Sequence, residues 1–172
     1  LQEELRIARE IDDPYLQEMC QENLGELYMT LGAYEQSIAA YTVAQSFAEA
    51  GGNAAGLAAG QIDIAGCLIE KRDFDGAQKM LKKAAALLED AQDVNIGAML
   101  SYRSGYLHLL RGGAEDLDQA LVHFNRLGDL ADRHGFDSFR ILARSYAGLA
   151  QLRLGRAAAA LELSSEAIAL AE

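Results

Sequence analysis

Apolar residues recur at helical spacing along nearly the whole chain, and single glycines interrupt the pattern at intervals. This pattern predicts four successive pairs of helices. The connections within and between the pairs are short, about two to four residues, so neighbouring helices should run antiparallel. The first helix of the first pair is expected to end near Leu31, and the second helices are expected at roughly 34–50, 74–90, 115–134 and 157–171. The sequence therefore predicts an all-α protein.

Small residues mark the same two places in every pair, and they reveal a repeat of about 40 residues. In the first helices they are Gly25, Ala65, Gly105 and Gly148, in steps of 40, 40 and 43. In the second helices they are Ser37, Ala77, Ala120 and Ala160, in steps of 40, 43 and 40. One three-residue insertion near 113–116 accounts for both irregular steps. Because helices approach closely only where no large side chain stands at the crossing, Gly25 should face Ser37, and each pair should pack on its neighbours.

Residues that begin and end helices also stand at matching places in the pairs. The expected N-caps are Asp13, which precedes Pro14, and then Asn53, Asp93 and Asp137. The expected left-handed turns after first helices lie at Gly32, Gly112 and Gly155, with Arg72 in the place of glycine in the second pair. These signals predict helix boundaries independently of the apolar pattern.

Several of these residues together resemble the tetratricopeptide repeat family. They are the Leu-Gly-x-x-Tyr of Leu24–Tyr28, the Gly-x-Tyr of Gly32–Tyr34, and the small residues Ser37 and Ala44. The period is longer than the family's usual ~34 residues and no proline closes the second helix. In its longer period and its lack of this proline, the chain is similar to the variant of the repeat that is found in bacterial multidomain regulators, such as maltose-regulator-type activators and signal-transduction ATPases. The resemblance covers essentially the whole chain and implies a right-handed α-solenoid of antiparallel helix pairs.

We expect the 172 residues to be a fragment of a longer array in a multidomain protein. Residues 1–12 are interpreted as the second helix of a preceding repeat, followed by repeats at 13–52, 53–92, 93–136 and 137–172. Apolar faces near Leu5 and near Leu163–Leu170 should then be partly bare, which predicts some self-association in isolation.

Composition and charge narrow the classes of function. The chain is 51% hydrophobic, with 15 basic and 26 acidic residues and a net charge of −11. Nucleic-acid binding requires clustered cations, so this charge argues against it. No apolar run reaches the ~18 residues of a membrane helix, and the first residues do not resemble a signal peptide. A cytoplasmic protein is expected, with Cys20 and Cys67 buried and reduced rather than joined in a disulfide.

No residues in the sequence form a motif for catalysis. The histidines His108, His123 and His134 share no metal-ligand spacing with each other or with the cysteines. The glycine pairs at 51–52 and 112–113 lack the lysine of a phosphate-binding loop. We therefore expect no enzyme activity, no cofactor and no metal.

Acidic residues concentrate in one half of the chain. Residues 1–93 carry 17 acidic and 7 basic residues, a net charge of −10, whereas residues 94–172 carry a net charge of −1. Glu18, Glu22 and Glu26 stand four apart on one helix face. That face is either simply solvated or is a binding surface.

The family resemblance implies that the first helix of each pair lines a concave groove. The candidate partner-binding residues are then Met19, Glu22, Glu26, Met29, Ile62, Asp63, Tyr102, Arg103 and Tyr106. The family's clamp for a C-terminal carboxylate needs basic residues where Glu22 and Glu26 stand, so that clamp is not expected. A peptide or helix with basic residues beside an apolar anchor fits better, with Tyr102 and Tyr106 as aromatic anchors.

Two interpretations of these residues remain open at this point. The apolar groove residues either contact a partner, or pack between repeats or against a neighbouring domain. The sequence accordingly predicts a non-catalytic protein-interaction or regulatory module. The alternative is an assembly element that drives homo-oligomerisation of the parent protein.

Overall fold

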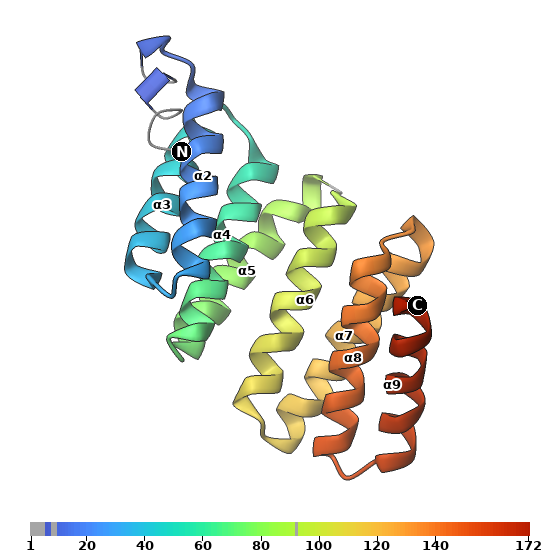
Figure 1. Ribbon diagram of the computed structural model, residues 1–172. Helices are drawn as coiled ribbons and strands as arrows, with labels where there is room; N and C mark the ends of the chain where they lie inside the picture. The colour runs from blue at the N-terminus through green and yellow to red at the C-terminus, as the bar shows by residue number, and fades with distance from the viewer. Residues whose placement is uncertain (1–5, 8–9, 92) are drawn as a thin grey trace. The chain divides into compact units, whose positions relative to one another are not determined.

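The computed structural model describes residues 6–7, 10–91 and 93–172, and every regular element in these ranges is an α-helix (Figure 1). The chain divides into two compact units, Leu1–Asp93 and Val94–Glu172. Unit 1 contains α2 (Pro14–Thr30), α3 (Tyr34–Ala50), α4 (Ala54–Glu70) and α5 (Phe74–Ala91). Unit 2 contains α6 (Val94–Arg111), α7 (Ala114–His134), α8 (Asp137–Arg153) and α9 (Ala157–Ala171). The predicted all-α class is confirmed.

Within each unit the helices pack in chain order. In unit 1, α2 contacts α3, α3 contacts α4, and α4 contacts α5. In unit 2, α6 contacts α7, α7 contacts α8, and α8 contacts α9; the two first helices α6 and α8 also touch each other. The second helix of one pair thus packs on the first helix of the next pair, which is the arrangement of an α-solenoid.

Helix boundaries agree closely with the sequence prediction. All four second helices match to within one residue at each end, and α2 ends at Thr30. Three first-helix turns are left-handed at glycine as expected, with φ of 71° at Gly32, 77° at Gly112 and 76° at Gly155. Arg72 takes the same conformation with φ of 61°, and its guanidinium lies 5.3 Å from the centre of the Phe74 ring.

Two of the predicted N-caps are confirmed and one is wrong. Asp13 Oδ1 accepts from the Leu16 amide at 3.1 Å, and Asn53 Oδ1 accepts from the Gly56 amide at 2.9 Å. Asp137, in contrast, is the first residue of α8, and Phe136 stands at its N-cap without a side-chain hydrogen bond. The first helices begin at 14, 54, 94 and 137, in the same steps of 40, 40 and 43 as the small residues, so the cap position of α8 is 136 and Asp137 stands one residue past it.

Close helix approach at the small residues is confirmed within the first pair. The Ser37 hydroxyl donates to the Gly25 carbonyl at 2.7 Å, and Ser37 is fully buried. A Cβ on Gly25 would lie only 2.6 Å from the Tyr41 ring. In unit 2, a Cβ on Gly105 would lie 2.7 Å from the Phe124 ring. Each glycine therefore allows a large aromatic side chain to lie directly against the backbone of the first helix.

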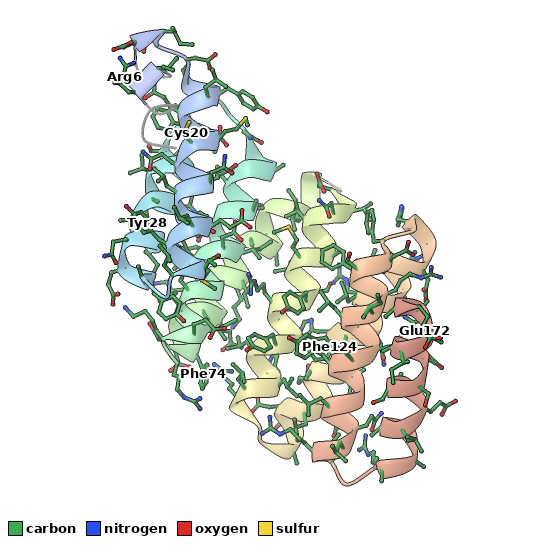
Figure 2. All side chains as sticks on the ribbon, in the orientation of Figure 1. Arg6, Cys20, Tyr28, Phe74, Phe124 and Glu172 are labelled. Carbon is green, nitrogen blue, oxygen red and sulfur yellow. The ribbon has the colours of Figure 1, made fainter. Side chains whose placement is uncertain are left out.

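Each unit has its own apolar core. The core of unit 1 includes Tyr41, Ile64 and Cys67, and the Cys67 thiol lies 3.2 Å from the Ser37 hydroxyl. Cys20 and Cys67 are both buried and form no disulfide, as expected. The core of unit 2 is centred on Phe124, which is labelled among the side chains of Figure 2. Its other members are Leu109, Leu117, Ala120, Leu121, Ala147 and Ala150.

The helix expected over residues 1–12 lies mostly outside the described residues. Of its described residues, Arg6, Ile7 and Glu10 are helical, and Arg6 forms an ion pair with Glu10. Its assignment to a preceding repeat stays a prediction.

Candidate functional site

Three tyrosines and one arginine from the first helices of unit 2 form a surface that we call the aromatic patch: Tyr102, Arg103, Tyr106 and Tyr146. Tyr102 and Tyr106 stand one turn apart on α6, and their rings stack with centroids 6.1 Å apart at an angle of 17°. Tyr146 projects from α8, and its ring centroid lies 5.7 Å from each of theirs. Direct contact between α6 and α8 thus brings residues forty or more positions apart into one cluster.

The core beneath the patch holds these rings in place. Phe124 of α7 is 1% exposed and stacks on Tyr146 with centroids 5.5 Å apart at an angle of 17°. The three tyrosines are partly exposed, so they have one side on the core and one side toward solvent. Aromatic side chains with few rotatable bonds and a buried support lose little conformational entropy on binding, which makes them effective anchors.

The polar groups of the aromatic patch are the Arg103 guanidinium and the tyrosine hydroxyls. The Arg103 guanidinium lies 5.4 Å from the centre of the Tyr102 ring, within the range of a cation–π contact. Burial, and then hydrogen bonding to Tyr146, raise the pKa of Tyr102 well above its ordinary value. The raised pKa therefore reflects a hydroxyl that is partly buried and hydrogen-bonded to Tyr146.

Exposed leucines continue the patch along α8. Leu149 is 42% exposed and Leu152 is 58% exposed, one turn apart and one turn beyond Tyr146. Large apolar side chains at helical spacing next to aromatic rings are typical of surfaces that receive an amphipathic helix.

Tyr146 was missed by the sequence analysis, whose candidate partner-binding residues in unit 2 are Tyr102, Arg103 and Tyr106. The repeat offset that links Gly105 to Gly148 also links Arg103 to Tyr146. Tyr146 also follows Leu142 and precedes Leu149 at helical spacing. This spacing could have identified Tyr146 as a candidate residue from the sequence.

In unit 1 the acidic residues of α2 do not form one uniform surface. Glu18 is 9% exposed, and its Oε1 lies 3.4 Å from the Asn53 side-chain nitrogen, at the N-terminus of α4. A helix N-terminus favours a carboxylate, which explains how this charge is buried. Burial and the nearby Glu18 carboxylate raise the pKa of Glu22, while Glu26 is exposed. Of the predicted partner-binding residues on this helix, Met19, which is 38% exposed, and Glu26 are open to a partner, and Glu22 is partly so.

Ile62 of the predicted groove is 0% exposed and belongs to the core, so it cannot contact a partner. Met29 is half-buried, and its sulfur accepts from the Cys67 thiol at 3.4 Å. Asp63 is partly exposed on α4. The burial of a residue on an amphipathic helix depends on how that helix is rotated about its axis, which the apolar pattern alone does not specify.

A hollow of about 640 Å³ lies within unit 1, between α3, α4 and α5. The Gln61 amide nitrogen donates to the Gln45 amide oxygen at 3.1 Å in its wall. Gln45 Nε2 and Gln61 Oε1 are buried without a hydrogen-bond partner among the described residues. The Thr42 and Ser46 hydroxyls in its lining donate to backbone carbonyls of their own helix, each at 2.7 Å. The lining residues are Thr42, Gln45, Ser46, Glu49, Leu57, Gln61, Lys83, Ala86 and Leu87.

Two histidines pack together in unit 2, although their spacing in the sequence does not suggest it. His108 Nδ1 lies 2.8 Å from Asp116 Oδ1, and the rings of His108 and His123 stack with centroids 5.7 Å apart. Burial, followed by repulsion from His108 and Arg126, lowers the pKa of His123 from 6.5 to about 4. Among the residues that the structure describes, no three His, Cys, Asp or Glu side chains gather as a metal site would require.

The lowered pKa of His123 predicts a loss of stability in mild acid. Between pH 6.5 and about 4 the unfolded chain binds a proton that folded His123 does not, so stability present above pH 6.5 is lost as pH falls through this window. Allowing for partial solvent screening, we expect a loss of about 1–2 kcal/mol. Urea unfolding at both ends of the window should show a smaller pH dependence in His123→Gln than in wild type. The exposed His134→Gln is the control, and an equal change in both variants would contradict the prediction.

Comparison with known proteins supports the fold. No protein-family model matches the chain, and no curated protein matches it. The crystal structure of MamA protein is similar, with a TM-score of 0.50 and 14% sequence identity, covering 89% of this chain and 91% of that chain. At this identity the likeness shows the fold alone, an all-α solenoid of helix pairs. No helix in the described ranges is both long and apolar enough to span a bilayer.

Proposed function

We propose that this chain is a non-catalytic protein-interaction or regulatory module that binds a peptide or partner helix on the first helices of its pairs. The observation that carries the proposal is the aromatic patch, with Leu149 and Leu152 exposed beside it. Exposed leucines and supported tyrosines on one side of a rigid helix pair suit the apolar face of an amphipathic segment. We further propose that the repeats at 13–52, 53–92, 93–136 and 137–172 serve this role within a larger cytoplasmic protein.

The partner is proposed to carry basic residues where it meets unit 1. The first helices α2 and α4 contain five acidic residues and no basic residue: Glu18, Glu22, Glu26, Asp63 and Glu70. Of these, Glu26 is exposed and Glu22 is partly exposed next to Met19. Opposite charges on a partner would steer association and favour this surface over the neutral surfaces of the chain.

A designed peptide tests this proposal. The probe is an amphipathic helix of about 14 residues with leucines at i, i+4 and i+7, lysines on the flanking positions and one tryptophan. The chain contains no tryptophan, so the probe's emission reports binding directly. We expect Glu22→Lys with Glu26→Lys to weaken binding at least tenfold. The control Glu49→Lys reverses an exposed acid on the second helix α3 and should leave affinity nearly unchanged. Absence of binding, or equal losses in both variants, would refute the proposal.

One observation favours the alternative of self-assembly. Leu161 is 71% exposed and Ile168 is 63% exposed on α9, two turns apart. The equivalent residue of α7, Leu121, is 8% exposed because α7 has α8 packed beside it. If a second copy covers α9, sedimentation should show concentration-dependent association that Leu161→Ser abolishes. The charge reversals at Glu22 and Glu26 should leave oligomer size unchanged.

A further inference from the structure

Charge is segregated between the first and second helices of unit 2. The first helices α6 and α8 carry five arginines and one acidic residue: Arg103, Arg111, Arg140, Arg144, Arg153 and Asp137. The second helices α7 and α9 carry seven acidic residues and two arginines: Glu115, Asp116, Asp118, Asp129, Asp132, Glu162, Glu166, Arg126 and Arg133. The two helices that bear the aromatic patch therefore contain more basic than acidic residues, although the protein as a whole is strongly acidic.

Three of these arginines are committed to contacts inside unit 2. Arg140 pairs with Asp132 at 2.8 Å and with Asp137 at 3.1 Å. Arg144 pairs with Asp132 at 2.9 Å and with Glu166 of α9 at 3.4 Å. Arg153 donates from Nη1 to the Leu109 carbonyl near the end of α6 at 2.5 Å. Their charges are partly neutralised or used to join helices.

Arg103 differs from them because it belongs to the patch itself. Within the described residues it forms no ion pair, and its contact is with the face of the Tyr102 ring. A cation–π contact leaves the N–H groups of a guanidinium available to a carboxylate. Beside it stand the rings of Tyr102, Tyr106 and Tyr146, which supply apolar surface.

We propose that the aromatic patch of unit 2 binds an acidic amphipathic helix of a partner protein, with a carboxylate on Arg103 and apolar side chains on the tyrosines, Leu149 and Leu152. This inference rests on the proposed function and makes it more specific. Unit 1 is proposed to meet basic residues of a partner, whereas unit 2 is here assigned an acidic ligand. The carboxylate accepts from the Arg103 guanidinium, while the leucines of the helix cover surface that is now exposed. Charge then selects the partner segment, and apolar burial supplies most of the affinity.

Two matched probes test the inference on the full chain. Both have the leucine pattern and tryptophan described above; one carries glutamates on the flanking positions and the other carries lysines. We expect Arg103→Gln to weaken the glutamate probe about five- to tenfold and to leave the lysine probe unchanged. Arg126→Gln removes an exposed charge from the second helix α7 of the same unit and is the matched control. Arg103→Glu should reverse the preference of unit 2 and weaken the glutamate probe further.

The outcomes separate this inference from the proposed function. If the glutamate probe binds and responds to Arg103 but not to Arg126, the inference is supported. If only the lysine probe binds, and it responds to Glu22 and Glu26, the proposed function stands and the inference is overturned. If neither probe binds, both are overturned. Thermal melts followed by circular dichroism check that each variant is folded. Arg103→Glu should also bind the lysine probe more tightly than wild type does, a gain that unfolding cannot produce.

Discussion

Replacing Phe124 with alanine is expected to lower the free energy of unfolding by about 3–5 kcal/mol. Phe124 is 1% exposed at the centre of the core of unit 2, where Leu109, Leu117 and Ala147 surround it. Alanine would leave a cavity that these side chains, held by three different helices, cannot close. The substitution also removes the ring on which Tyr146 stacks.

Urea unfolding followed by circular dichroism measures this effect. Val122→Ala is the control, because Val122 lies on the same helix but is 60% exposed, and it should cost less than about 0.5 kcal/mol. Phe124→Leu should fall between the two, since it removes less volume. A loss below about 1 kcal/mol for Phe124→Ala would mean that Phe124 does not hold α6, α7 and α8 together as described.

Adding a single methyl group at Gly105 is expected to cost about 1–3 kcal/mol, although alanine is the better helix former. The new Cβ would lie 2.7 Å from the Phe124 ring, which has no free space to move into because it is itself buried. Either the ring leaves its preferred position or α6 separates from α7.

Gly97→Ala supplies a control on the same helix. Gly97 also lies within α6, but a Cβ there meets no atom within 4 Å. This substitution should stabilise the chain by about 0.5–1 kcal/mol through helix propensity alone. In a double-mutant cycle, Gly105→Ala should cost less in the Phe124→Leu background, because the smaller side chain leaves room for the methyl group. Additive effects would show that the two residues do not compete for the same space.

The two glycines with the closest aromatic neighbours are equivalent in the repeat, and this connects stability to the candidate site. Gly25 admits Tyr41 in unit 1, and Gly105 admits Phe124 in unit 2. In unit 2 the admitted ring then supports Tyr146 and, through it, the aromatic patch. A close helix crossing therefore positions the surface that we propose for binding.

Parts of the candidate site followed from the sequence and parts did not. The stack of Tyr102 on Tyr106 follows from their spacing on one helix, because residues four apart are neighbours on any α-helix. Tyr146 completes the cluster only because α8 packs against α6. The burial of Ile62 and Glu18 likewise depends on neighbouring helices, whereas the sequence pattern placed Ile62 in the groove and Glu18 on one face with Glu22 and Glu26.

Local chemistry determined the helices of this protein. Caps such as Asp13 and Asn53, left-handed glycines such as Gly32, and apolar spacing act over a few residues, so the sequence alone specifies them. The rotation of each helix about its axis is set by contacts with side chains far away in the chain. Only the tertiary structure therefore decided that Tyr102 and Tyr106 belong to a cluster completed by Tyr146 of another helix, and that Glu18 is buried at a helix N-terminus.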